Sequence, residues 1–328
     1  MPIIGKLRYA FTGGKGGVGK TVLAAALAYD KAADGKETLL VSLNPVHSLS
    51  NLFNQNFKGG KIAKVEGVDN LYAVEVEIDD IVKSYKERMA TRLREFFKWA
   101  EVPINPDPFI DIATTNPAFQ EAAMFDKVMD IIIEESGKYD AIIFDTAAVA
   151  NAVRLIGLSK LYGLWLARMI ESRREALQLR YKLSVRKDKV MEEIKKDPIL
   201  NDLLALNQKF SETRKILTNP NMTGFYFVTI PQALSISVVK RFIKMVTGFD
   251  IPMGGVFVNM VLDKEEVARD DTGYLKSRYE EQARYIKDIK ESMGEYVRGY
   301  VRLYERDITG IEDIKRVVED IYSFEPEV

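Results

Sequence analysis

The amino-acid sequence predicts an α/β fold in which a mostly parallel, doubly wound sheet carries an inserted α-helical subdomain. Apolar runs alternate with helix-type patterns along the 328-residue chain, and runs that are apolar on both faces are typical of a parallel sheet covered by helices. Two long segments without such runs, 78–135 and 150–217, predict the helical insertion. The predicted strands are 7–11, 38–43, 71–76, 141–144, 225–230, 254–258 and 297–303.

The first predicted strand runs directly into the glycine-rich stretch 12–21. Residues 14–21 match G-x-x-x-x-G-K-[ST] in full, and an Ala- and Leu-rich helix is expected over 22–33. The glycines let successive backbone N–H groups surround an anion, and the helix dipole points at the same place. This pattern predicts a phosphate-binding loop, against the alternative of a glycine-rich turn that only packs. The nucleotide-binding residues expected here are Gly14, Lys15, Gly16, Gly17, Val18, Gly19, Lys20, Thr21 and Val22.

Two side chains are expected to hold Mg²⁺ beside the phosphates. Lys20 should reach the β- and γ-phosphates, and the Thr21 hydroxyl is placed to ligate the metal. The predicted strand 141–144 ends in Asp145, which corresponds to a Walker B carboxylate because Mg²⁺ in such sites takes one or two carboxylates and keeps several waters. An apolar strand that ends in Asp is common, so this assignment depends on the phosphate loop. ATP and Mg²⁺ are therefore the expected ligands, at the carboxyl ends of the strands.

The second strandless segment carries an apolar stripe at helical spacing, followed by a strongly charged stretch over 173–196. Such a stripe is more often core packing, and otherwise a groove for an apolar client. The predicted division is 1–77 for the first part of a nucleotide-binding domain, 78–135 for a helical segment partly in the helical subdomain, 136–153 for the Walker B strand and second switch, 154–218 for the helical subdomain, and 219–328 for the last part of the nucleotide-binding domain.

The composition limits the classes of binding partner and the cellular location that we expect. The net charge of −1 argues against nucleic-acid binding, which normally requires a basic excess. The chain has no cysteine and a single histidine, His47, which excludes disulfides and thiolate metal sites. The first strand is expected within a few residues of Met1, which leaves no room for a signal peptide. The apolar stretch 147–169 is interrupted by Arg154, Lys160 and Arg168, so we expect a cytoplasmic protein that meets membranes only through a partner.

Lys15 lies inside the loop, where a second lysine is unusual. The run 13–21 resembles the deviant Walker A loop of the family that includes the arsenite-pump ATPase, the ATPase that delivers tail-anchored membrane proteins, and the MinD and ParA positioning ATPases. In that family the extra lysine crosses a dimer interface to the partner's nucleotide. The resemblance implies a P-loop NTPase fold of the SIMIBI type, a homodimer, and a catalytic role for Lys15 with Lys20. The alternative is a solvated lysine on a loop.

Further segments resemble the arsenite-pump and tail-anchored-targeting branch. The stretch 41–50 looks like its first switch, 116–122 is similar to its P-P-G-x-D-E-A segment, and 145–155 is similar to its second switch. Gln232 and Asn259 fall where the family has a glutamate near the nucleotide and an asparagine that reads adenine. An Asn amide can hydrogen-bond the adenine N6 and N7 edge.

Several positions depart from the family pattern. Asn44 stands where the family has an aspartate that orients and activates the attacking water, and an amide can position water but cannot accept its proton. Phosphoryl transfer depends chiefly on positioning and charge neutralisation, so the sequence leaves open how much the change to Asn44 slows ATP hydrolysis. The stretch 148–153 lacks the polar groups of the usual second switch, and Gln232 lacks the charge of a glutamate. Thr272 and Leu275 occupy the positions of the zinc-binding cysteines.

The first hypothesis is a cytoplasmic, homodimeric, Mg-ATP-binding protein with slow or lost hydrolysis, which acts as a nucleotide-gated carrier for tail-anchored membrane proteins. Its partner would be an apolar client helix. One alternative is an active ATPase in which Asn44 positions water. A MinD-like positioning ATPase is disfavoured by the helical insertion and by the lack of a terminal amphipathic basic helix. An arsenite pump is disfavoured because the chain has no thiolate.

Overall fold

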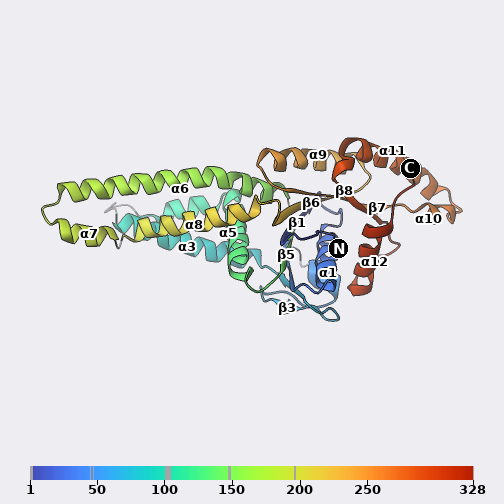
Figure 1. Ribbon diagram of the computed structural model, residues 1–328, viewed down its shortest axis with the longest axis horizontal. Helices are drawn as coiled ribbons and strands as arrows, with labels where there is room; N and C mark the ends of the chain where they lie inside the picture. Colours follow the sequence, from blue (N-terminus) through green and yellow to red (C-terminus); the bar gives the residue numbers. More distant parts are fainter. Residues whose placement is uncertain are drawn as a thin grey trace.

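A computed structural model describes residues 3–44, 46, 48–99, 105–146, 149–195 and 197–327 (Figure 1). Its sheet has eight strands in the order β3-β4-β2-β5-β1-β6-β7-β8. All neighbouring strands are parallel except β3, which is antiparallel to β4. The strands are β1 (Tyr9–Gly14), β2 (Thr38–Leu43), β3 (Ala63–Lys64), β4 (Leu71–Glu75), β5 (Ala141–Thr146), β6 (Thr223–Thr229), β7 (Met253–Val261) and β8 (Val297–Arg302). This arrangement confirms the predicted α/β fold.

Helices cover both faces of the sheet and also form a lobe beside it. The described helices are α1 (Lys20–Ala33), α2 (Ser48–Phe53), α3 (Ile78–Trp99), α4 (Asp107–Thr114), α5 (Pro117–Glu135), α6 (Val149–Leu183), α7 (Lys187–Lys195), α8 (Pro198–Leu217), α9 (Ala233–Gly248), α10 (Lys264–Ala268), α11 (Tyr274–Met293), the 3₁₀ turn η1 (Gly294–Tyr296) and α12 (Gly310–Ser323).

Each face of the sheet has its own apolar core, because successive residues of a strand point to opposite faces. On one face, α1 and α12 pack residues such as Leu27 and Val317 against the sheet. On the other face, Phe11 stacks between Phe144 and Phe225, with ring centroids 4.6 Å apart on each side. The three residues are register partners on β5, β1 and β6. Their rings therefore pack in a row across these three central strands.

The helical lobe includes α3, α6 and α8, and α7 joins α6 to α8 at the end farthest from the sheet (Figure 1). A buried ion pair between Arg173 and Asp197 links α6 to the start of α8. Asp197 also accepts a hydrogen bond from the Leu200 N–H at 2.7 Å and so caps α8. Within the described helices, none is long and apolar enough to cross a membrane.

The strand predictions differ from the structure mainly at strand ends. The first strand begins at Tyr9 rather than at residue 7, because residues 3–6 form a turn, and it continues to Gly14. The two-residue edge strand β3 was not predicted, since it is too short to show a pattern. The described parts of the strandless segments are mainly helical, as expected. The proposed domain division stays a prediction, and its boundary at residue 154 lies inside the continuous helix α6.

Candidate nucleotide site

The glycine-rich stretch forms the connection between β1 and α1, at the carboxyl end of the central strand. Gly17 and Gly19 have φ angles of 79° and 88°. Residues that have a Cβ atom rarely adopt such angles. A Cβ at Gly16 or Gly17 would meet no heavy atom within 4 Å, whereas one at Gly19 would lie 2.2 Å from the Asn259 Nδ2 atom. The loop is thus open on one side and packed against β7 on the other, an arrangement that leaves room for an anion beside its backbone.

The two lysines of the loop differ in their surroundings. The Lys20 side chain is 8% exposed, and its ammonium donates a hydrogen bond of 3.1 Å to the Lys15 carbonyl oxygen. Burial lowers the pKa of Lys20, and the charge of Asp145 acts in the opposite direction. Lys15 itself is exposed. Lys20 is therefore held inside the loop, whereas Lys15 faces solvent in the single chain.

Asp145 and Thr21 come together at the edge of the loop. Asp145 is fully buried at the end of β5, and its Oδ2 accepts a 2.7 Å hydrogen bond from the Thr21 hydroxyl. Its other oxygen, Oδ1, is buried and has no hydrogen-bond partner among the described residues. Burial raises the pKa of the Asp145 carboxyl. A buried carboxylate oxygen without a donor, next to a hydroxyl, is a donor set that suits a hard cation such as Mg²⁺.

Asn44 follows β2, the neighbour of β5 in the sheet. Its N–H lies 3.3 Å from the Ser42 Oγ, and its Oδ1 accepts a hydrogen bond of 3.2 Å from the Val46 N–H. The side chain therefore shapes its own turn at the strand end. Pro45 and His47, which belong to the same predicted switch, lie outside the described residues, as do residues 147 and 148 of the second switch.

Asn259 contacts the phosphate loop directly. It is 4% exposed on β7, where its Nδ2 donates to the Val18 carbonyl oxygen at 2.9 Å and its Oδ1 accepts from the Met260 N–H at 2.9 Å. Gln232 is exposed at the start of α9, and among the described residues no hydrogen bond joins it to the loop. The roles of Asn259 in reading adenine and of Gln232 near the nucleotide stay predictions.

Two serines to which the sequence patterns assigned no role also belong to the site. Ser42 is fully buried, is the register partner of Asp145, and has its Oγ 3.4 Å from Asp145 Oδ2. The Ser48 Oγ lies 3.4 Å from the Thr21 hydroxyl. Strand order is the signal that identifies Ser42, because only the pairing of β2 with β5 brings it to the carboxylate.

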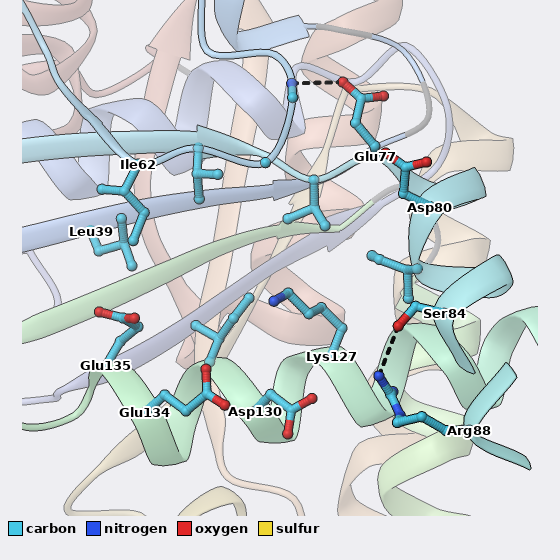
Figure 2. Close-up of a pocket in the computed structure, with 16 residues that line it drawn as sticks. Leu39, Ile62, Glu77, Asp80, Ser84, Arg88, Lys127, Asp130, Glu134 and Glu135 are labelled. Atoms are coloured by element: carbon cyan, nitrogen blue, oxygen red, sulfur yellow. Dashed lines mark hydrogen bonds between the residues drawn. The ribbon is translucent and has the colours of Figure 1, made fainter. Parts of the chain in front are cut away.

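A cavity of about 360 Å³ lies elsewhere, between the β2–β4 part of the sheet and helices α3 and α5. Figure 2 shows Lys127 and Asp130 on α5, and Asp80 and Arg88 on α3, among the residues that line it. Two cations and five carboxylates line it, namely Arg88, Lys127, Glu77, Asp80, Asp130, Glu134 and Glu135. This excess of negative charge does not suit a polyphosphate, and no phosphate-loop residue lines the cavity.

Comparisons with known proteins cover nearly the whole chain. The family of anion-transporting ATPases matches residues 7–323. The chain is 30% identical to ATPase GET3C of Arabidopsis thaliana over 87% of this chain and 74% of the relative. It is 28% identical to ATPase ASNA1 homolog 2 of Paramecium tetraurelia over 95% of this chain and 93% of the relative. It is 25% identical to putative arsenical pump-driving ATPase 2 of Aquifex aeolicus over 94% of this chain and 97% of the relative.

Proposed function

The chain belongs to the anion-transporting ATPase family, and from this premise we propose that it is a homodimeric, Mg-ATP-binding carrier for tail-anchored membrane proteins. Its hydrolysis is slow or lost, so that bound ATP sets the state of the carrier. The observation that carries the proposal is the convergence of Lys20, Thr21 and Asp145 at the end of β1 and β5. The resemblance of the switch segments to the tail-anchored-targeting branch supports the client class.

Three side chains would hold Mg-ATP in this proposal. Thr21 and Asp145 would hold the cation, which would neutralise charge on the phosphates during phosphoryl transfer. Lys20 would move its ammonium from the Lys15 carbonyl, 3.1 Å away, to the phosphates. Asn44 could orient a water through its amide, but it has no group that accepts the proton. These residues therefore suit nucleotide retention better than rapid hydrolysis.

Exposed apolar side chains on the helical lobe support an apolar client. Leu179 and Leu183 are 58% and 77% exposed and lie one turn apart on α6, beside the fully exposed Val185. Leu164 is 61% exposed on the same helix. Neighbouring exposed leucines, such as Leu179 and Leu183, suit a hydrophobic interaction surface. The occupant that we propose is the transmembrane helix of a client protein.

The double substitution Leu179→Ser and Leu183→Ser is expected to lower the amount of a co-expressed transmembrane-helix client that copurifies with the protein by about 5-fold or more, because about 1.5–3 kcal/mol is lost with each buried leucine side chain. ATP affinity should not change. Leu234→Ser, at a similarly exposed leucine (59%) on α9, is the matched control. Equal client recovery from both variants would contradict a client surface on this lobe.

Lys15→Ala is expected to abolish ATP-dependent dimerisation or compaction, because in the proposed dimer the exposed Lys15 serves the partner's nucleotide. Two-fold symmetric dimers are the commonest closed assembly. Sedimentation velocity with and without ATP measures the effect, and ATP binding to the monomer should survive. Lys36→Ala, at an exposed lysine just after α1, is the control. A wild-type protein that stays monomeric with and without ATP would argue against the dimer.

A further inference from the structure

Glu75 lies at the end of β4, outside the phosphate loop and both switches. We propose that it is a positioning residue of the nucleotide site: its buried carboxylate fixes the first turn of α2 and so holds Ser48 beside Thr21. This inference rests on the proposed nucleotide function. It adds a residue from a fifth strand, β4, to a site that otherwise draws on β1, β2, β5 and β7.

Three hydrogen bonds join the Glu75 carboxylate to the start of α2. The side chain is 1% exposed. Its Oε1 accepts hydrogen bonds from the Leu49 N–H at 2.7 Å and the Ser50 N–H at 3.0 Å, and its Oε2 accepts from the Ser50 hydroxyl at 2.6 Å. Bonds from N–H groups to a carboxylate are about twice as strong as neutral ones. The carboxylate therefore satisfies N–H groups that have no partner within the helix.

Fixing this turn also fixes one end of the first switch. Ser48 is the first residue of α2, and its Oγ lies 3.4 Å from the Thr21 hydroxyl, which in turn bonds Asp145. At the other end, the Ser42 Oγ accepts from the Asn44 N–H at 3.3 Å. The segment between Ser42 and Ser48 is thus held at both ends by buried polar groups.

Strand register places Glu75 in line with the metal-binding carboxylate. Glu75 is the register partner of Ser42, and Ser42 is the register partner of Asp145. Neighbouring strands lie about 4.8 Å apart, so the two backbones are about 10 Å apart. Burial raises the pKa of Asp145, and the negative charge of Glu75 acts in the same direction. Glu75 therefore adds negative potential where the cation would bind.

Removing the carboxylate should leave the fold intact. Leu49, Leu52 and Phe53 are buried in the core that contains α1, which keeps α2 docked by its apolar face. The backbone of Glu75 has its own bonds, from its N–H to the Phe57 carbonyl oxygen at 3.0 Å and from the Gly60 N–H to its carbonyl oxygen at 3.2 Å. The expected change is thus confined to the first turn of α2.

The test compares full-length wild type, Glu75→Gln, Glu75→Ala and Glu77→Gln. Glu77 is a matched control because it loses the same charge two residues away, whereas its carboxylate accepts from the Gly59 N–H at 2.9 Å (Figure 2). The rate of amide hydrogen exchange over residues 48–53, measured without nucleotide, reports how stably the first turn of α2 is formed. Calorimetry of ATP binding in excess Mg²⁺, and again in EDTA, reports the site.

In Glu75→Ala, exchange at Leu49 and Ser50 should be about 10-fold faster or more, the scale of a lost hydrogen bond to a charged group. Mg-ATP affinity should fall about 10-fold, while ATP affinity in EDTA should stay as in wild type. Glu75→Gln should give a smaller change in the same direction, because an amide oxygen keeps neutral hydrogen bonds. Glu77→Gln should behave as wild type.

Two outcomes would overturn the inference while ATP binding stands. One is that both Glu75 variants match Glu77→Gln. The other is an equal loss of affinity in Mg²⁺ and in EDTA, which would show a merely structural role. Failure of the proposed function looks different: wild type and Glu77→Gln would both fail to bind ATP, and the positioning role would fall with it.

Discussion

Lys20→Ala is expected to weaken Mg-ATP binding by about 10-fold or more, the scale of a lost charge-assisted contact. The ammonium of Lys20 is held 3.1 Å from the Lys15 carbonyl oxygen, inside the loop in which Gly16 and Gly17 face open space. It is the buried cation of this loop and stands beside Asp145. The substitution removes a positive charge from the expected position of the β- and γ-phosphates.

Isothermal titration calorimetry with Mg-ATP measures this effect. Lys36→Ala is the matched control, because it removes the same charge from an exposed position just after α1. A circular dichroism melt should show that Lys20→Ala remains folded, since the helix begins at this residue and its apolar face is unchanged. Unchanged affinity in a folded Lys20→Ala protein would contradict the assignment of the phosphate loop.

Local patterns were sufficient to predict where the glycine-rich loop and most strands lie. The motif at residues 14–21 is contiguous, so its position between β1 and α1 follows from the sequence of one segment. The β2 bounds agree with the structure because Thr38–Leu43 is buried along its whole length. Apolar runs of this kind are typical of strands that are buried on both faces of a parallel sheet.

The contacts that Asn259, Ser42 and Glu75 make with distant segments could not be predicted in this way. Asn259 bonds the Val18 carbonyl oxygen across 241 residues of sequence, and nothing in either segment specifies the other. The polar row of Glu75, Ser42 and Asp145 exists only because β2 lies between β4 and β5. Strand order is a property of the whole fold, so the serines and Glu75 were found only in the structure.

Asn44→Asp is expected to raise ATP turnover by about 10–100-fold, the lower part of what general-base catalysis supplies. The substitution is close to isosteric. It keeps an oxygen that can accept the hydrogen bond that the Val46 N–H now donates to Asn44 Oδ1 at 3.2 Å. It therefore changes the ability to accept a proton without removing the turn at the end of β2. Asn44→Ala is the control, because it removes both the turn contact and any positioning of water.

If neither protein hydrolyses ATP, the altered stretch 148–153 is the deeper cause. Bound ATP would then act as a lasting structural ligand that holds one state of the dimer. Client release would in that case require a partner. If wild type is already fast and Asn44→Asp changes nothing, positioning alone suffices and the chain is an ordinary ATPase.

Single-turnover hydrolysis tests the proposed mechanism most directly. The protein is in excess over ATP, and wild type is compared side by side with Asn44→Asp. It follows the chemical step on ATP that is already bound, so it separates retention from weak binding. We predict that wild type keeps its ATP intact far longer and that Asn44→Asp cleaves it about 10–100-fold faster. Rapid cleavage by wild type at the rate of Asn44→Asp would contradict a carrier whose hydrolysis is limited by Asn44.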